Sequence, residues 1–278
     1  MIVNDNSDIL LTFSWGDFTH GISGHLFECI DYYLLLKKHF KVKILIPEKI
    51  NNISKIIQDK YNLSEKETKD ILSNIILGKP VLVKTNNILF CDGGYNKIKS
   101  SNIIAKNKIG FACGDKTILE QDDIYVLLDY RVYDTIPKNS FNYKKKLYFD
   151  KYKKEVKKGS KTLIYATENC RLTDKELPNQ LKLTKKDLPY LGLFDEIDSY
   201  LYTVVPRHFD CSSRLIPECK YYNKKVIFDD EVKKYFFEDK GLFFRYLDTK
   251  VDFDSLFLKE DDEIIDILKK IIKEDNEL

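Results

Sequence analysis

The residues best suited to chemistry lie between Pro206 and Phe228, in the run PRHFDCSSRLIPECKYYNKKVIF. This run follows the apolar segment 200–205 and ends in the apolar segment 225–228. Short apolar runs on either side of a polar turn and a helix-like segment predict a strand, a turn, a helix and a second strand. We therefore expect the polar turn to lie at the end of a strand.

The turn carries groups that suit a nucleoside diphosphate. A helix start offers free N–H groups and the positive end of the helix dipole to an anion. Ser212, Ser213 and Arg214 stand at that start, and an arginine can bind a phosphate through two parallel hydrogen bonds. Glu218, further along the helix, would accept hydrogen bonds from the hydroxyl groups of a ribose.

The N-terminal part of the chain predicts the opening unit of a Rossmann-like parallel sheet. A strand, a glycine-containing loop, a helix and a second strand are expected over residues 8–13, 14–25, 26–40 and 41–46. Ligands of such sheets sit at the carboxyl ends of the strands, so the loop is placed to form part of a site. Its Gly21-x-x-Gly24 pattern lacks the G-x-G-x-x-G order, which disfavours NAD and FAD.

The same loop contains three side chains that could transfer a proton or bind an acceptor. These are Asp17, His20 and His25, and the chain has only four histidines in all. Histidine titrates close to neutral pH and is often a general base. The alternative is that these side chains form hydrogen bonds that shape the loop and that the glycines let it turn.

Further elements follow from the remaining pattern. We expect helix over residues 51–79, with Ser64 and Glu67 as a capping box. Short strands are expected over 81–84, 88–90, 103–105, 109–112 and 124–129, as hairpins rather than full strand–helix–strand units. In the second half we expect a strand over 161–166, short helices within 173–190, a short helix over 231–237 and an amphipathic helix over 259–278.

Composition excludes several classes of protein. The chain has 278 residues, of which 43% are apolar, with 46 basic and 44 acidic residues, so it is neither disordered nor strongly basic as a whole. Its six cysteines form no CxxC pair, and no apolar run approaches a membrane span, so we expect a reduced, soluble protein of the cytoplasm. Residues 142–161 hold nine lysines, which predicts a solvated helix or a linker between domains, or else a contact with a polyanion such as DNA.

The stretch around Arg214 also resembles the donor site of GT-B glycosyltransferases. In that family an acidic residue, seven others and a glutamate lie within a strand–turn–helix unit, as Asp210 and Glu218 do here. Asp210 stands where the family usually has glutamate, and Cys211-Ser212-Ser213 replaces its glycine-rich turn. The resemblance implies that Arg171, after the strand 161–166, contacts the diphosphate of the donor together with Ser212, Ser213 and Arg214.

The resemblance further implies an α/β fold with two Rossmann-like domains that face a cleft. The domains would span residues 1–155 (acceptor side) and 156–258 (nucleotide-sugar side), and residues 259–278 would form a helix that returns to the first domain. The implied activity is transfer of a hexosyl or pentosyl group from a nucleotide sugar to a hydroxyl group, either of a glycan or of a hydroxymethylated DNA base. Asp17 and His20 are the first candidates for catalysis, with Gly21, Gly24 and His25 near the cleft. We expect no cofactor and no metal, because Asp252-Phe253-Asp254, the motif that binds metal in GT-A enzymes, lies beyond the two-domain pattern.

Two other functions fit the same residues. A non-catalytic nucleotide-binding or nucleic-acid-binding protein of this fold would keep Arg214 and Glu218 without needing Asp17 or His20. A nucleotide-sugar epimerase would bind the same donor but would turn it over without an acceptor.

Overall fold

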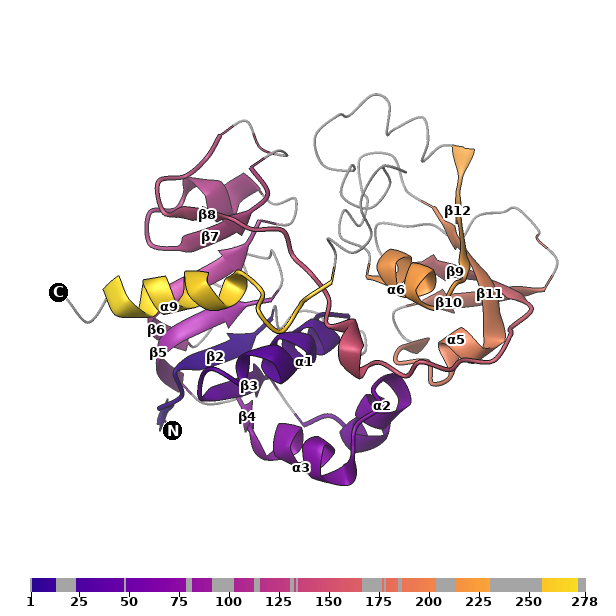
Figure 1. Cartoon of the computed structure of the whole chain (residues 1–278), viewed down its shortest axis with the longest axis horizontal. Coiled ribbons are helices and arrows are strands. Elements are labelled where there is room, and N and C mark those ends of the chain that lie inside the picture. Colours follow the sequence, from indigo (N-terminus) through magenta and orange to yellow (C-terminus); the bar gives the residue numbers. More distant parts are fainter. Residues whose placement is uncertain are drawn as a thin grey trace.

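A computed structural model of the chain describes residues 2–13, 24–47, 49–78, 82–91, 103–112, 116–130, 133, 135–166, 177, 179–184, 187–203, 214–230 and 257–274. Every structural statement below concerns these residues. Their strands form two parallel sheets, a larger and a smaller one (Figure 1). The α/β class expected from the sequence is confirmed.

The larger sheet has eight strands, and all of their pairings are parallel. The strands are β1 (Ile2–Asn4), β2 (Ile9–Thr12), β3 (Val42–Ile46), β4 (Ile75–Leu77), β5 (Leu82–Phe90), β6 (Ile103–Phe111), β7 (Tyr125–Leu128) and β8 (Ser140–Asn142). Their order is β4-β3-β2-β5-β6-β7-β8, and β1 pairs with the first residues of β5. The chain therefore extends the sheet in one direction from β2 and then in the other from β5.

The central strand β2 points buried apolar residues to both faces of this sheet, because both faces are covered. On β2, Ile9 and Leu11 lie in one core cluster while Leu10 lies in the other, as the alternation of side chains along a strand requires. The first cluster is completed by helices α1 (Gly24–Leu36), α2 (Ile53–Lys60), α3 (Glu65–Ser73) and α9 (Ile264–Glu274). The second cluster includes Ile118 of the 3₁₀ helix η2 (Lys116–Glu120).

The smaller sheet has four parallel strands with a core of its own. The strands are β9 (Lys161–Ala166), β10 (Gln180–Thr184), β11 (Ile197–Tyr202) and β12 (Lys225–Phe228), in the order β10-β9-β11-β12. Two helices belong to this part, α5 (Leu193–Glu196) and α6 (Leu215–Tyr221). Ile216 and Cys219 of α6 are buried against this sheet. The predicted strand, helix and strand around residues 200–228 are thus confirmed.

The expectation of short strands and hairpins in residues 81–129 is wrong. β5 and β6 are single strands of nine residues each, and β5, β6 and β7 pair in parallel. Polar residues in the middle of each strand concealed its length. These residues are satisfied inside the sheet, where the side-chain amide of Asn107 donates to that of Asn87 at 2.8 Å and Asn87 donates to the carbonyl oxygen of Asp8 at 2.9 Å.

Two segments expected to be helical contain strands. The helical region 51–79 holds α2 and α3 with the predicted capping box, but its last part is β4, whose pairing with β3 prevails over local helical preference. Similarly, β10 lies within residues 173–190 because it can pair with β9 at the edge of the smaller sheet. The predicted helix over 231–237 lies outside the described residues.

The lysine-rich segment is not a solvated helix. After β8 it crosses from the larger to the smaller sheet (Figure 1), with a single 3₁₀ turn, η3 (Phe149–Lys151). Its aromatic residues Tyr143, Tyr148 and Tyr152 are buried in the core of the larger sheet. The tyrosines between the lysines therefore anchor the segment.

The C-terminal helix α9 lies on the same face of the larger sheet as α1 (Figure 1). Ile264, Leu268 and Ile271 form its buried stripe, as the amphipathic pattern predicts. Polar contacts fix the approach to the helix, since Lys146 pairs with Asp262 at 2.8 Å and Lys38 pairs with Glu260 at 2.5 Å. The end of the described chain is thereby attached to elements from its beginning.

Candidate functional site

Each sheet has a point where the order of its strands reverses, and ligands of open parallel sheets bind at the carboxyl ends of the strands at such a point. In the larger sheet the reversal lies between β2 and β5, and in the smaller sheet between β9 and β11. The segment that follows β2 leads into α1, and the segment that follows β11 leads into α6. The sequence-predicted site residues belong to the segments that follow β2, β9 and β11.

The starts of α1 and α6 meet. Gly24 is the first residue of α1, and a Cβ atom placed on it would lie 3.4 Å from Cδ of Arg214, the residue that precedes α6. Two stretches that are almost 200 residues apart in the sequence are therefore in contact. A Cβ atom at position 24 would thus be in ordinary van der Waals contact with the arginine side chain.

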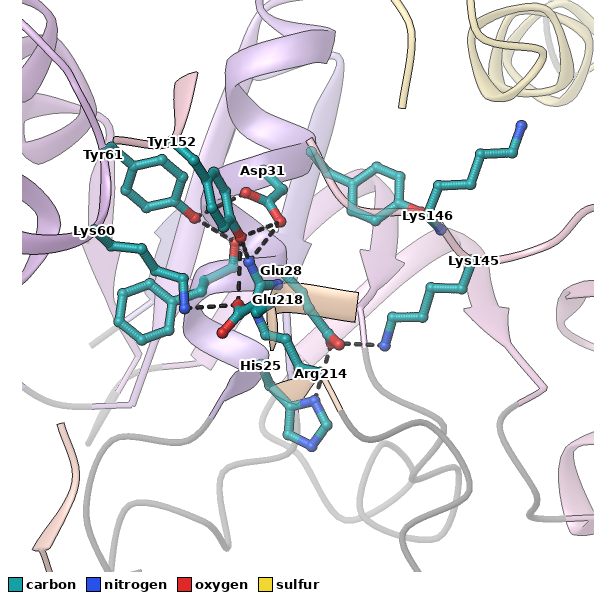
Figure 2. A network of polar contacts seen from close by, with 12 residues as sticks. His25, Glu28, Asp31, Lys60, Tyr61, Lys145, Lys146, Tyr152, Arg214 and Glu218 are labelled. Carbon is teal, nitrogen blue, oxygen red and sulfur yellow. Dashed lines mark hydrogen bonds and ion pairs between the residues drawn. The ribbon is translucent and has the colours of Figure 1, made fainter. Parts of the chain in front are cut away.

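Arg214 is the centre of a buried network of polar contacts (Figure 2). Its Nε donates to Oε1 of Glu218, one helical turn further along α6, at 2.5 Å. Its Nη2 donates to Oδ2 of Asp31 on α1 at 2.7 Å and also to the hydroxyl oxygen of Tyr152. Burial opposes the charge on Arg214, yet the carboxylates of Asp31 and Glu218 raise its pKa above the usual value.

Glu218 is bound by a second cation, which comes from the larger sheet's helices. Nζ of Lys60, at the end of α2, lies 2.6 Å from Oε1 of Glu218. Lys60 also lies 4.3 Å from the centre of the Phe27 ring, a cation–π contact. Burial lowers the pKa of Lys60, an effect that the carboxylate of Glu218 opposes.

Asp31 is fully buried and accepts several hydrogen bonds. The hydroxyl group of Tyr61 donates to its Oδ1 at 2.8 Å, and that of Tyr152 donates to its Oδ2 at 3.3 Å. Burial raises the pKa of Asp31 to about 6, although the charge on Arg214 and the bond from Tyr61 act in the opposite direction. This carboxyl group therefore titrates within reach of physiological pH.

A second acidic residue of α1 links the network to His25. Oε2 of Glu28 lies 3.0 Å from Nδ1 of His25 and 2.6 Å from Nζ of Lys145 (Figure 2). Burial alone would raise the pKa of Glu28, but Lys145 and His25 outweigh it and hold that pKa at about 2. Glu28 is thus ionised over the whole physiological range.

Two atoms of the network have no hydrogen-bond partner among the described residues. Arg214 is 9% exposed, and its buried Nη1 has no hydrogen-bond partner. Within the described part of the chain, the contacts of the Glu218 carboxylate with Arg214, Lys60 and Tyr152 all go to Oε1. One donor and one acceptor, Nη1 of Arg214 and Oε2 of Glu218, therefore remain on the two residues for which the sequence predicts a nucleotide.

The structure describes four of the sequence-predicted site residues and brings them together. Gly24 and His25 begin α1, and Arg214 and Glu218 belong to the start and middle of α6. The other candidates, Asp17, His20, Gly21, Arg171, Ser212 and Ser213, lie outside the described residues, as does the Asp252–Asp254 motif. The roles predicted for all of these residues stay predictions.

Sequence reasoning missed the partners that the network takes from the larger sheet's side, namely Asp31, Lys60, Tyr61 and Tyr152. One signal was present in the sequence. Glu28 and Asp31 are carboxylates three residues apart in an otherwise apolar helix, and buried carboxylates need partners. Lys60 and Tyr152 gave no such signal, because each comes from a stretch with several other lysines or tyrosines.

The described residues contain no group of three His, Cys, Asp or Glu side chains that could hold a metal ion. In the same part of the chain, every helix is too short or too polar to cross a membrane. Comparison with known proteins finds no match to a family model, to a curated protein or to a solved structure.

Proposed function

We propose that the chain is a glycosyltransferase of the GT-B type that moves a sugar from a nucleotide-sugar donor to a hydroxyl group. One observation carries this proposal. Arg214 and Glu218 follow a strand at the reversal point of one parallel sheet, and they lie against the start of α1, which follows the reversal-point strand of the other. A donor bound at the first place would therefore have its reactive end near residues of the second.

The two available atoms suit the two ends of a nucleoside diphosphate sugar. Nη1 of Arg214 would donate to a phosphoryl oxygen, and Oε2 of Glu218 would accept from a ribose hydroxyl group. Because sugar transfer leaves negative charge on the departing diphosphate, a fixed guanidinium group beside it would stabilise the transition state. We assign Ser212, Ser213 and Arg171 to the same diphosphate.

The acceptor side of the reaction is assigned to the loop before α1. Asp17 and His20 are proposed to contact the acceptor hydroxyl group, since in the sequence they lie between β2 and Gly24, the residue next to Arg214. The proposed acceptor is a glycan or a hydroxymethylated DNA base. Exposed lysines Lys154, Lys157 and Lys158, near the start of the smaller sheet, support the second of these. We place the enzyme in the cytoplasm, where the buried cysteines Cys29, Cys91 and Cys219 would stay reduced.

The test is a thermal-shift panel of nucleoside diphosphates and nucleotide sugars on three proteins: the wild type, Glu218→Gln and Glu155→Gln. Glu155 is exposed and serves as the matched control. A ligand at about a hundred times its dissociation constant adds about 2.7 kcal/mol of stability. We expect one nucleotide to stabilise the wild type and the control but not Glu218→Gln. The shift in unfolding temperature is measured for each protein with and without ligand, so a lower starting stability of Glu218→Gln does not affect the comparison.

Nucleotide release is then measured with glycan acceptors, with hydroxymethylated DNA and without an acceptor. Release that needs an acceptor supports transfer, whereas conversion of the sugar without an acceptor supports an epimerase. Binding with no turnover of any kind would identify a non-catalytic nucleotide-binding protein. If no nucleotide stabilises the wild type, the donor-site assignment is wrong.

A further inference from the structure

In the contact between Asp31 and Arg214, a carboxylate oxygen occupies a guanidinium donor that could also bind a phosphoryl oxygen. Oδ2 of Asp31 lies 2.7 Å from Nη2 of Arg214, and both side chains are buried. A carboxylate oxygen and a phosphoryl oxygen are the same kind of acceptor for a guanidinium group. Asp31 thus occupies Nη2 of Arg214, the residue that the proposed function assigns to the donor diphosphate.

The two carboxylates on Arg214 differ in how they are held. Glu218 is on the same helix as Arg214, at the i,i+4 position, and moves with it. Asp31 belongs to α1 on the other sheet, so its contact can break while α6 stays intact. If this contact breaks, the Asp31 carboxyl group can still accept a hydrogen bond from the hydroxyl group of Tyr61, which lies 2.8 Å from its Oδ1.

The charges of the network are already balanced without a ligand. Arg214 and Lys60 contribute two positive charges, and Asp31 and Glu218 contribute two negative charges. A donor diphosphate would add negative charge to this buried place, and an excess of one sign is costly away from water. The least costly adjustment is for one carboxylate to become neutral.

We propose that the Asp31 carboxylate and the donor diphosphate compete for Arg214, so that the donor binds as Asp31 takes up a proton and releases the guanidinium group. This inference rests on the proposed function. It assigns to Asp31 control over the donor site, although Asp31 itself need not touch the donor.

The surroundings of Asp31 determine the pH range in which this competition operates. The titratable and charged groups around Asp31 come from four places. Arg214 and Glu218 belong to α6, Lys60 and Tyr61 to the end of α2 and the residue after it, Tyr152 to the segment around η3, and Glu28 to α1 itself. Burial, the largest effect, raises the pKa of Asp31 from 3.8 to about 6. Below that pH the carboxyl group is mostly protonated, so it no longer holds Nη2 of Arg214 by charge, and this atom can join Nη1 in binding the diphosphate. Because donor binding would raise the pKa of Asp31 above its value in the free protein, donor binding should strengthen as the pH falls towards about 6 and level off below it.

The experiment is calorimetric titration of UDP-glucose, GDP-mannose and ADP-glucose at pH 5.5 and pH 7.5. Nucleotide sugars are used because their diphosphate is esterified at both ends and keeps its charge over this range. For the wild type we expect about tenfold tighter binding at the lower pH, which corresponds to about one pKa unit of linkage. At pH 7.5 we also expect proton uptake, seen as a binding heat that depends on the ionisation enthalpy of the buffer.

Asp31→Asn is the decisive variant, since its amide oxygen can still accept from Arg214 but carries no charge. We expect it to bind the nucleotide sugar about tenfold more tightly than the wild type at pH 7.5, with little change at pH 5.5. Asp266→Asn, on the exposed side of α9, is the matched control and should behave as the wild type. A purely structural role of Asp31 predicts weaker binding in the variant, so the direction of the change separates the two.

The outcomes separate this inference from the proposed function. Binding of a nucleotide sugar with the same affinity at both pH values and without proton uptake would contradict the competition between Asp31 and the donor. It would still agree with the proposed donor site. Weaker binding by folded Asp31→Asn would also contradict the competition. If Asp31→Asn does not fold, the pH dependence and proton uptake of the wild type still decide. Failure of all three nucleotide sugars to bind the wild type and the variant at either pH would remove the proposed function and this inference with it.

Discussion

Arg214 shows at the scale of single residues how the fold tolerates buried charge. Its guanidinium group is shared between Asp31 from one sheet's helices and Glu218 from the other's, and Tyr152 completes the contact. Two carboxylates can be buried side by side because the arginine and Lys60 lie between and beside them. Removal of one charge would therefore leave its buried partners without a neutralising neighbour.

We expect Arg214→Met to lower the free energy of unfolding by about 3–5 kcal/mol, because it leaves buried carboxylates without their main partner. Urea denaturation at pH 7 measures the loss. Lys108→Met is the matched control: Lys108 is a surface partner of Asp123 at 2.8 Å, and its removal should change stability by less than about 1 kcal/mol. Equal effects of the two substitutions would show that the network contributes no more than a surface ion pair.

At the scale of elements, local sequence and tertiary contacts act together in α3. Ser64 accepts a hydrogen bond from the backbone N–H of Glu67 at 3.2 Å, and Glu67 accepts one from the N–H of Ser64 at 2.9 Å. Hydrogen bonds from Ser64 and Lys151 lower the pKa of Glu67 to about 2. The start of this helix is thus secured by its own residues and by a lysine of the crossing segment.

Ser64→Ala should destabilise the protein by about 1 kcal/mol, the usual effect of losing a helix N-cap. Chemical denaturation with a fixed m-value measures it. Ser73, at the other end of α3, only donates to the carbonyl oxygen of Asp70 in the same turn, and Ser73→Ala should stay within about 0.5 kcal/mol of the wild type. A cost for Ser73→Ala as large as that for Ser64→Ala would contradict the capping argument.

The whole molecule is held together by elements from both ends of the chain. α9 packs on the core of the larger sheet, and the segment that leads to it pairs with the crossing segment through the bridge between Leu147 and Phe257. Leu268 of α9 is fully buried in this core. The core on this face of the larger sheet is therefore complete only when α9 has docked.

We expect Leu268→Ala to cost about 2–5 kcal/mol, the range for deleting a buried leucine side chain. Lys269→Ala, at the next position on the half-exposed side of α9, should remain within about 0.5 kcal/mol of the wild type. Thermal and urea unfolding of both variants test this. A small effect of Leu268→Ala would mean that α9 contributes little to the core.

Part of the site was predictable from the sequence because its signals are local. The turn before α6 placed Arg214 and Glu218 on a helix between two strands, and both strands and the helix are present. A helix after the first buried strand was also predicted, but α1 begins at Gly24, so Gly24 and His25 belong to the helix and not to the loop expected over residues 14–25. Strand ends and helix starts are set by apolar runs, turns and caps, which are visible within about ten residues.

The lengths and partners of the middle strands were not predictable in this way. Asn87 and Asn107 read as breaks, but they bond to each other inside the sheet. β4 and β10 read as helix because only pairing with β3 and β9 makes them strands. Strand pairing is a long-range contact, and its free energy does not depend on the residues next to each strand alone.

By itself, the sequence determined the α/β class, the strand–helix–strand unit around Arg214 and the amphipathic C-terminal helix, since each follows from local periodicity. Only the tertiary structure decided that α1 and α6 meet at Gly24 and Arg214. The same is true of the partners of that arginine, Asp31 and Tyr152, and of Lys60 beside Glu218. The physical reason is that a buried charge must be neutralised by whatever the fold brings within about 3 Å of it, and that neighbour is chosen by how the two sheets pack.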